Sequence, residues 1–273
     1  MPFQPGVRAA IVLLVIASCA VGAPAISLIS VKDEIAMGRE AQEDFKARTP
    51  EVTDPSVVRY VTRVGRALAA SAEGPRYPYS FSVANYREIN ALALPGGPVW
   101  VHRGAMAAAA NEAQLAGVLA HEIAHIAERH AADRITKRLV ANGLIGLLGA
   151  MLGNDGGGAR AAQTGAQVLA GGYLLKFSRD DERSADRVGA RIMRRAGWDP
   201  RQMVAFLATL QREQGRNPGA VEVFLSSHPA PAERVEHLRT AVRNTGGGRR
   251  DSDEFRRVRR RLSALPPAKP MPR

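Results

Sequence analysis

The ten residues from His121 to His130 constrain the fold of this chain more than any other feature. They contain the pattern His-Glu-x-x-His, formed by His121, Glu122 and His125. On an α-helix, residues four apart lie about 40° apart around the axis and about one turn apart along it. Both imidazoles could therefore bind one metal ion from a single helix face, while Glu122 takes a proton from a metal-activated water.

The flanking residues predict the helix that this pattern requires. Asn111 with Gln114 forms an N-cap pair. Apolar residues then recur at helical spacing, at Leu115, Val118, Leu119, Ile123 and Ile126. On a continuous helix His130 would point about 140° away from His125, so we expect it to have a structural role.

Composition favours one large domain with appendages. The chain has 273 residues, of which 45% are hydrophobic, enough to bury a substantial core. The formal net charge is +12, but no basic patch is interleaved with aromatic residues, so we expect no nucleic-acid partner. Attraction to anionic lipid or simple solubility explains the charge more economically.

Residues 1–25 are expected to be a signal peptide, with Arg8 before a short apolar run. Two processing routes fit it. Residues 16–19 resemble a bacterial lipobox, so lipidation of Cys19 would anchor the protein to the membrane as a lipoprotein; alternatively, Ala23-Pro24-Ala25 is a site for ordinary cleavage. Both predict the periplasm. Cys19 is the only cysteine, which excludes an intramolecular disulfide and a zinc site made of thiolates.

A β-hairpin is predicted before the central helix. Residues 89–102 contain two extended runs separated by the turn sequence Pro95-Gly96-Gly97-Pro98. A strand-like alternation precedes it, at Tyr79, Phe81 and Val83. Pro98 has no backbone donor, so we expect its strand at a sheet edge. Such an edge could bind an extended peptide through main-chain hydrogen bonds, or the hairpin could be purely structural.

The segment after the central helix, residues 139–175, is apolar but interrupted by glycine. Neither of its apolar runs is long enough without interruption to predict a transmembrane helix. A mobile lid, a hairpin that touches the membrane and a helical hairpin packed on the core all fit this composition.

The C-terminal half predicts further helices. Ser178 is an N-cap candidate for a helix that ends near Ala196, before Gly197. Another short helix is expected over Ala232–Val242. Residues 244–273 form a basic, proline-rich tail whose end we expect to be disordered.

Two histidines do not complete a catalytic zinc site, which usually has three protein ligands and a water. The candidates for the third ligand are Glu182, Asp186, His102, His130 and His228. Glu182 fits best, because it lies on a capped helix whose small residues could pack on the central helix. Asp186, one turn later, could accept a hydrogen bond from a ligand histidine. The two acids could instead form a solvated face beside neighbouring arginines.

Four ordered segments resemble the M48 family of zinc metallopeptidases, of the gluzincin type. The segment Asn90–Gly97 resembles the family's edge strand, and His121–His125 with His130 resembles its zinc helix. Glu182–Asp186 is similar to its E-x-x-x-D motif, and Ser227-His228-Pro229, with Arg234, to its S-H-P motif. The resemblance spans about residues 31–240. The resemblance does not extend to the multi-span membrane architecture or to the long helical-repeat domain that some relatives have.

The resemblance implies roles for residues at the matching positions. His121, His125 and Glu182 would bind one Zn²⁺ per chain, Glu122 would be the general base, and Asp186 would orient a ligand histidine. His228 would stabilise the oxyanion or occupy the open metal position in a resting state, unless it is only a local structural contact. The residues implied in substrate binding are Asn90, Pro95, Gly96 and Gly97.

The expected fold is therefore α+β and mainly α: a zincin-like catalytic domain over residues 26–243, with the metal-binding helix beside a small sheet. The expected function is a zinc-dependent metalloendopeptidase that cuts unfolded or misfolded envelope proteins. The alternative is a chaperone-like or assembly factor with latent proteolysis. A membrane-embedded processing protease would require residues 139–175 to enter the bilayer.

Overall fold

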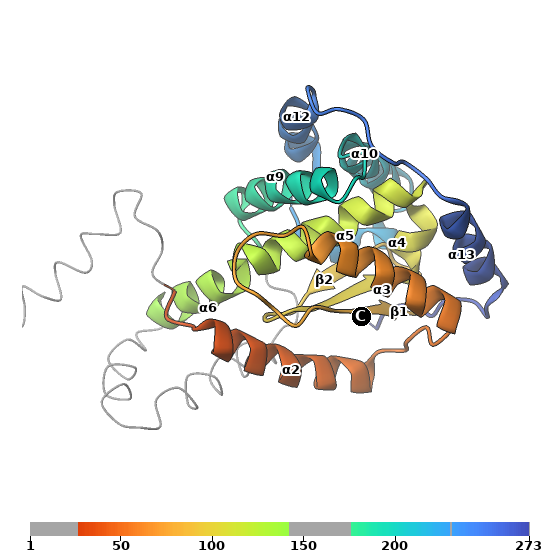
Figure 1. The fold of residues 1–273 in the computed structure, drawn as a ribbon. Helices are drawn as coiled ribbons and strands as arrows, with labels where there is room; N and C mark the ends of the chain where they lie inside the picture. Colours follow the sequence, from red (N-terminus) through yellow and green to blue (C-terminus); the bar gives the residue numbers. More distant parts are fainter. Residues whose placement is uncertain (1–26, 142–175, 230, 273) are drawn as a thin grey trace, which may run out of the picture.

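A computed structural model describes residues 27–141, 176–229 and 231–272 of the protein (Figure 1). In these ranges helices predominate, and the strands form one small sheet. The expected fold class, mainly α with a small sheet beside the helix of His121 and His125, is confirmed. The predicted signal peptide with Cys19 and most of the glycine-rich insertion lie outside the described residues.

The sheet consists of β1 (Ser80–Ala84), β2 (Ala91–Ala93) and β3 (Pro98–His102), in the order β1-β3-β2. β1 pairs with β3 in parallel, and β2 pairs with it antiparallel, which confirms the hairpin. The expectation that the strand of Pro98 lies at an edge is wrong, because β3 is central. Pro98 is its first residue, a position at which a strand tolerates the missing backbone donor. Its carbonyl accepts from Leu94 N at 2.8 Å. Among these strands, β2 is an edge.

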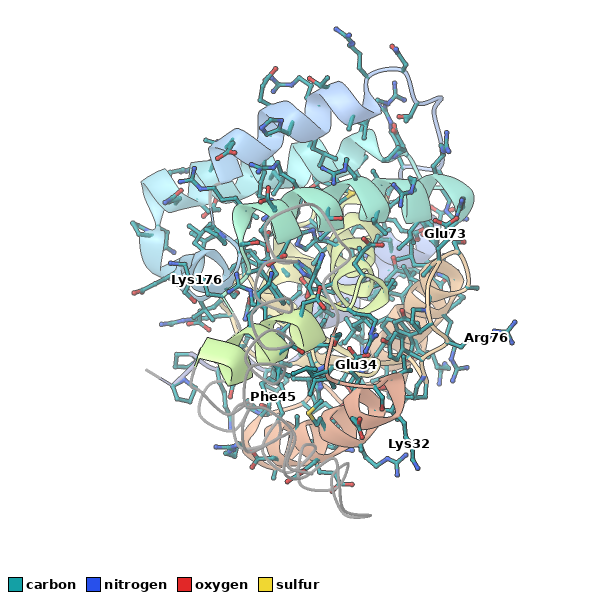
Figure 2. All side chains as sticks on the ribbon, turned by 90° about the vertical axis from the view of Figure 1, so that its left-hand side faces the viewer. Lys32, Glu34, Phe45, Glu73, Arg76 and Lys176 are labelled. Atoms are coloured by element: carbon teal, nitrogen blue, oxygen red, sulfur yellow. The ribbon has the colours of Figure 1, made fainter. Side chains whose placement is uncertain are left out.

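Helices cover both faces of the sheet (Figure 1). α2 (Val31–Arg48) lies on one face, where Phe45 packs edge-on against Trp100 with ring centroids 4.9 Å apart. Figure 2 shows Glu34 and Phe45 on the inner side of α2, while Lys32 is exposed. α3 (Pro55–Ala69) and α5 (Glu112–Ala127) lie on the opposite face. The predicted alternation places Phe81 and Val83 in the core on the side of α3 and α5, with Tyr79 packed against it. Ala84, at the end of β1, belongs to the core on the side of α2.

α5 forms where the sequence predicted the central helix, after α4 (Arg103–Ala108). The Asn111 side chain accepts from Gln114 N at 3.1 Å, which confirms the N-cap. Every residue of α5 is buried. A buried polar side chain is costly unless another group pairs with it. The histidines and glutamates of α5 therefore require partners from neighbouring elements.

The principal neighbour of α5 is α9 (Arg179–Arg195). Ser178 and Asp181 form a capping box at its start, and Gly197 follows its end with a φ of 86°. A Cβ at Gly189 would lie 3.2 Å from both Ala120 O and His121 N. α9 and α5 therefore pack closely, as the small residues of α9 predicted.

The remaining helices continue the helical layer. α6 (His130–Ala141) follows α5 directly, while α10 (Arg201–Arg216), the 3-10 turn η2 (Pro218–Ala220), α11 (Glu222–Ser227) and α12 (Pro231–Val242) follow α9. α10 packs on α5 and α12, and α12 packs on α9. No helix in the part of the chain that the structure describes is both long and apolar enough to cross a bilayer.

The C-terminal residues are ordered against the body, contrary to the expected disordered end. α13 (Asp253–Ala264) buries Phe255, Val258 and Leu262 and packs on α3. Beyond it, Arg87 N donates to Lys269 O and Lys269 N donates to Asn85 O, each at 3.0 Å. The three apolar residues recur at helical spacing and form one buried face. Burial of this face stabilises the helix against the body although the segment is rich in arginine.

Candidate metal centre

Four side chains from three parts of the chain converge in the core. His121 and His125 lie on α5, Glu182 lies on α9, and His228 follows α11. One ligand atom from each lies within 4.8 Å of all the others, and all four residues are buried. The structure thus brings together the three residues predicted as metal ligands and His228, which was predicted to approach the metal.

The spacing of the donor atoms fits a small cation. Nε2 of His121 and Nε2 of His125 are 3.1 Å apart, and Nε2 of His125 is 3.3 Å from Oε1 of Glu182. Nδ1 of His228 is 2.9 Å from Oε1 of Glu182 and 3.4 Å from Nε2 of His121. Donor atoms about 2.1 Å from a tetrahedral ion lie about 3.4 Å apart. Nitrogen and carboxylate oxygen are donors that zinc accepts.

Glu122 projects beside this cluster and is fully buried. Neither of its carboxylate oxygens has a hydrogen-bond partner within the described part of the chain, and the nearest histidine nitrogen, Nε2 of His228, is 3.7 Å from Oε1. A buried carboxylate is costly unless a cation or donor compensates it. Its environment therefore also fits a metal held by the neighbouring ligands.

Asp186 contacts His121, a candidate metal ligand, without belonging to the cluster. Its Oδ1 is 3.0 Å from Nδ1 of His121, on the side of the ring away from the cluster. Two hydrogen bonds from Arg234 of α12 reach the same carboxylate, from Nε at 2.8 Å and Nη2 at 2.7 Å. Burial disfavours the charge, but Arg234 and His121 outweigh it and hold the pKa of Asp186 well below its usual range.

Arg234 also compensates the charge of Glu182, since its Nη1 lies 2.5 Å from Oε2. Burial raises the pKa of Glu182, but His228 and Arg234 more than offset this and hold the pKa well below its usual range. In the sequence, Arg234 is recognisable only as part of the S-H-P motif. Its contact with both acids could not be read from spacing, because α12 and α9 meet only in the folded chain.

His130 lies against His125, and the expectation that it points away is wrong. α5 ends at Ala127, Arg129 has a φ of 60°, and α6 begins at His130. Nδ1 of His130 is 2.9 Å from Nδ1 of His125. Burial lowers the pKa of His130, which favours its neutral form.

The other histidine considered as a ligand, His102, does not belong to the cluster. His102 ends β3 and lies 5.2 Å from Tyr86, measured between ring centroids. Its ring is buried, and neither of its nitrogens has a side-chain partner within the described ranges. Burial lowers its pKa to about 4, so it is neutral at physiological pH.

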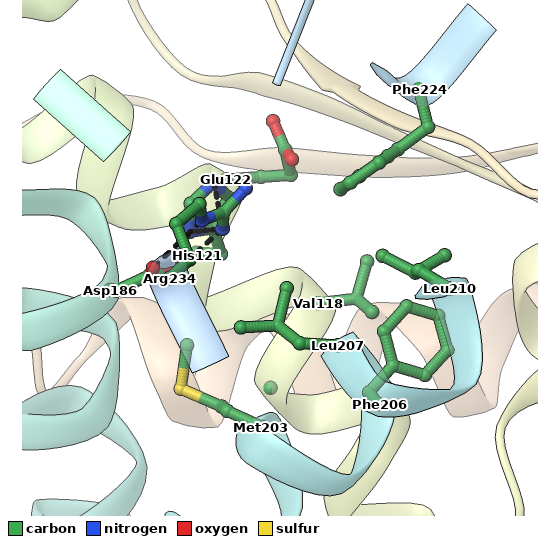
Figure 3. Close-up of a pocket in the computed structure, with 11 residues that line it drawn as sticks. Val118, His121, Glu122, Asp186, Met203, Phe206, Leu207, Leu210, Phe224 and Arg234 are labelled. Carbon is green, nitrogen blue, oxygen red and sulfur yellow. Dashed lines mark hydrogen bonds and ion pairs between the residues drawn. The ribbon is translucent and has the colours of Figure 1, made fainter. Parts of the chain in front are cut away.

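An apolar pocket lies beside Glu122, between α5 and α10 (Figure 3). It encloses about 320 Å³, with its open mouth included. Figure 3 shows His121, Asp186 and Arg234 together at one side of the pocket and Phe224 at the other. The apolar lining residues are Val118, Met203, Phe206, Leu207, Leu210 and Phe224.

A second pocket lies on the other side of the cluster, beside His125. It encloses about 250 Å³, and Pro95 and Gly96 contribute to its wall. Gly96 also permits the approach of α2, since a Cβ there would lie 2.4 Å from Glu34 O. Gly97, with a φ of 131°, completes the turn. Asn90 is fully buried, and its carbonyl accepts from His102 N at 2.9 Å.

Comparisons with known proteins agree with this geometry. The model of peptidase family M48 matches residues 55–242. The chain is 33% identical over 223 residues to the "Beta-barrel assembly-enhancing protease" of Yersinia pestis, covering 80% of this chain and 46% of that protein. The protein of the same name from Escherichia coli (strain K12) is 33% identical over 224 residues, with 80% and 45% covered.

A protein from a yeast is also similar to the chain. The "Mitochondrial metalloendopeptidase OMA1" of Schizosaccharomyces pombe is 31% identical over 206 residues, covering 73% of this chain and 59% of that protein. The chain spans about half the length of the bacterial relatives. The family and these names support a metalloendopeptidase with a metal cofactor. The chain belongs to peptidase family M48.

Proposed function

We propose that the protein is a zinc-dependent metalloendopeptidase that hydrolyses peptide bonds of unfolded or misfolded envelope proteins. One observation carries the proposal: donor atoms of His121, His125 and Glu182 converge beside the buried carboxylate of Glu122, which has no hydrogen-bond partner among the described residues. The envelope as its place of action rests on the predicted signal peptide and on relatives named for β-barrel assembly. Periplasmic location and lipidation of Cys19 belong to the same proposal.

His121, His125 and Glu182 would hold one Zn²⁺. When bound, zinc would lower the pKa of a water towards about 7 and polarise the scissile carbonyl. Glu122 takes the proton of the attacking water and delivers it to the leaving amine. Asp186, held by Arg234, keeps the Nδ1 proton of His121 in place, so that the lone pair of Nε2 faces the cluster.

The position of His228 supports one of its two suggested roles. Its Nδ1 lies among the ligand atoms, 2.9 Å from Oε1 of Glu182. A catalytic zinc site keeps one position for water, whereas a fourth protein ligand closes it. We therefore infer that His228 occupies this position in a resting state and must move before substrate is cut.

The apolar pocket supports unfolded proteins as substrates. It adjoins Glu122, where a scissile bond would lie, and it offers apolar side chains such as Leu207 and Phe206. Large apolar residues are mostly buried in folded proteins and become accessible on unfolding. The edge strand β2 could bind the same extended chain through its backbone, near the turn of Pro95 and Gly96.

A second function deserves a test, because His228 fills the cluster. The protein could act mainly as a chaperone-like or assembly factor that binds unfolded chains, with latent proteolysis. The words "assembly-enhancing" in the names of the bacterial relatives fit this alternative. It uses the same pocket and edge strand but does not require Glu122.

The test compares the full chain with its Glu122→Gln variant, which keeps the size of the side chain and removes the base. We expect about one zinc per chain in both proteins, and casein cleavage that the substitution slows by roughly 10²–10⁴-fold. Equal cleavage by both would refute the role of Glu122. Equal zinc with casein bound but uncut by either would favour the chaperone-like alternative, and absence of zinc would refute the metal site.

A further inference from the structure

We propose that His130 is a positioning residue: it accepts a hydrogen bond from Nδ1 of His125 and so fixes the orientation of that metal ligand. The inference rests on the metal site of the proposed function. The two Nδ1 atoms are 2.9 Å apart. The rings meet edge to face, with centroids 4.9 Å apart and planes at 71°. Both side chains are buried, so water does not compete for the contact.

The direction of this hydrogen bond follows from the cluster. Nε2 of His125 faces Nε2 of His121 at 3.1 Å and Oε1 of Glu182 at 3.3 Å. A neutral imidazole carries one ring proton, and only its unprotonated nitrogen can bind a metal. The proton of a ligating His125 is therefore on Nδ1, and His130 must present an unprotonated Nδ1 to receive it. One contact selects the tautomers of both rings.

A break in the helix aims His130 at this ring. Arg129 adopts a φ of 60°, which a non-glycine residue takes only when its surroundings enforce it. Its Nε lies 3.3 Å from Oε1 of the buried Glu34, and its Nη2 donates to Ile29 O. Tyr77 donates its hydroxyl to the same carboxylate. α2 thus holds the residue whose conformation turns the chain back at His130.

Packing alone would not orient His125. Phe177 stacks on its ring with centroids 3.9 Å apart and planes at 28°. An apolar face limits the tilt of the ring but does not distinguish its nitrogens from its carbons. The hydrogen bond to His130 does so, as Asp186 does for His121 at 3.0 Å. The two ligand histidines are therefore held by different groups, one by a carboxylate and one by an imidazole.

The test uses two substitutions of similar size, His130→Leu and His130→Asn, in the full chain. The side-chain oxygen of asparagine lies about where Nδ1 of histidine does and can accept from His125, whereas leucine cannot. The dissociation constant for zinc, measured by competition with a chelator, should rise roughly 10–100-fold in His130→Leu. His130→Asn should restore most of the affinity. His237→Leu is the matched control, because that ring is 61% exposed.

Two outcomes would overturn the proposal: unchanged zinc affinity in His130→Leu, or equal weakening by leucine and asparagine. If His130→Leu does not fold, as judged by urea unfolding of the metal-free protein, His130→Phe replaces it, since an aromatic ring keeps the packing beside Phe177. A wild-type chain that binds no zinc would refute the proposed function itself. A different set of results would refute only this inference. In it the wild type binds zinc, Glu122→Gln abolishes cleavage, and His130→Leu or its replacement leaves the zinc affinity unchanged.

Discussion

The guanidinium of Arg234 and the carboxylate of Asp186 form a two-point hydrogen-bonded pair, with Nε–Oδ2 and Nη2–Oδ1 distances of 2.8 and 2.7 Å. Oδ1 of the same carboxylate lies 3.0 Å from Nδ1 of His121. The pair therefore connects α12 and α9 to α5. A two-point contact of this kind fixes orientation as well as charge, which a lysine could not reproduce.

Replacing Asp186 by asparagine should weaken both stability and metal binding. The substitution keeps the shape but leaves Arg234 with one charged partner, at a cost of about 3–5 kcal/mol for a broken buried pair. We also expect zinc affinity to fall roughly 10–100-fold, because His121 loses its anionic partner. Urea unfolding and chelator competition measure the two effects. The control is Asp180→Asn, at a side chain that is 86% exposed. If Asp186→Asn changed stability and zinc affinity as little as this control, the prediction would be contradicted.

Removal of the His228 side chain should increase hydrolysis. His228→Ala leaves three ligands, enough for a catalytic zinc, and frees the position that its Nδ1 takes beside Glu182. The expected result is unchanged zinc content with faster casein cleavage. Slower cleavage at the same zinc content would instead support stabilisation of the oxyanion by this ring.

Filling the apolar pocket should change which bonds are cut. Leu207→Trp adds volume to the wall beside Glu122, so chains with a bulky apolar residue at the scissile bond should be excluded. Mass spectrometry of casein fragments would show fewer cuts next to phenylalanine and leucine, while zinc content stays the same. The matched control on α10 is Gln214→Ala, at an exposed position. An unchanged fragment pattern would mean that the pocket does not receive substrate.

His102 should make the protein less stable in mild acid. Burial lowers its pKa to about 4 in the folded state, against about 6.5 in an unfolded chain. Between these values the unfolded state binds the proton, so stability falls as the pH drops from about 6.5 to about 4. The full loss is about 3 kcal/mol, at 1.4 kcal/mol per pKa unit.

The measurement is urea unfolding as a function of pH for wild type and His102→Gln, which does not titrate in this range. The wild type should lose about 3 kcal/mol more than the variant over this interval. His237→Gln, at an exposed ring, should follow the wild type. Parallel curves for wild type and His102→Gln would disprove the assignment.

The C-terminal helix should contribute to the stability of the domain. Phe255 is 1% exposed and lies 6.1 Å from Tyr60 of α3, between ring centroids. Phe255→Ala should cost about 3–5 kcal/mol in the free energy of unfolding. The exposed Arg257→Ala serves as the control in urea unfolding. A loss no greater than that of the control would mean that α13 is dispensable.

Local features of the sequence determined much of the fold. Asn111 caps α5, Ser178 caps α9, and the four-residue spacing of His121 and His125 places both imidazoles on one helix face. These features depend on neighbours within one or two helical turns, so helical geometry and side-chain chemistry suffice to predict them.

The tertiary structure alone decided which distant groups meet. It placed β3 rather than β2 at the centre of the sheet and turned His130 back onto His125. It also brought Arg234 to the acids of α9 and His228 to Glu182. These contacts depend on the packing of α2, α9 and α12 around α5, and no local pattern encodes it. The sequence thus determined the donor groups and their helices, whereas packing determined how each donor is oriented and charged.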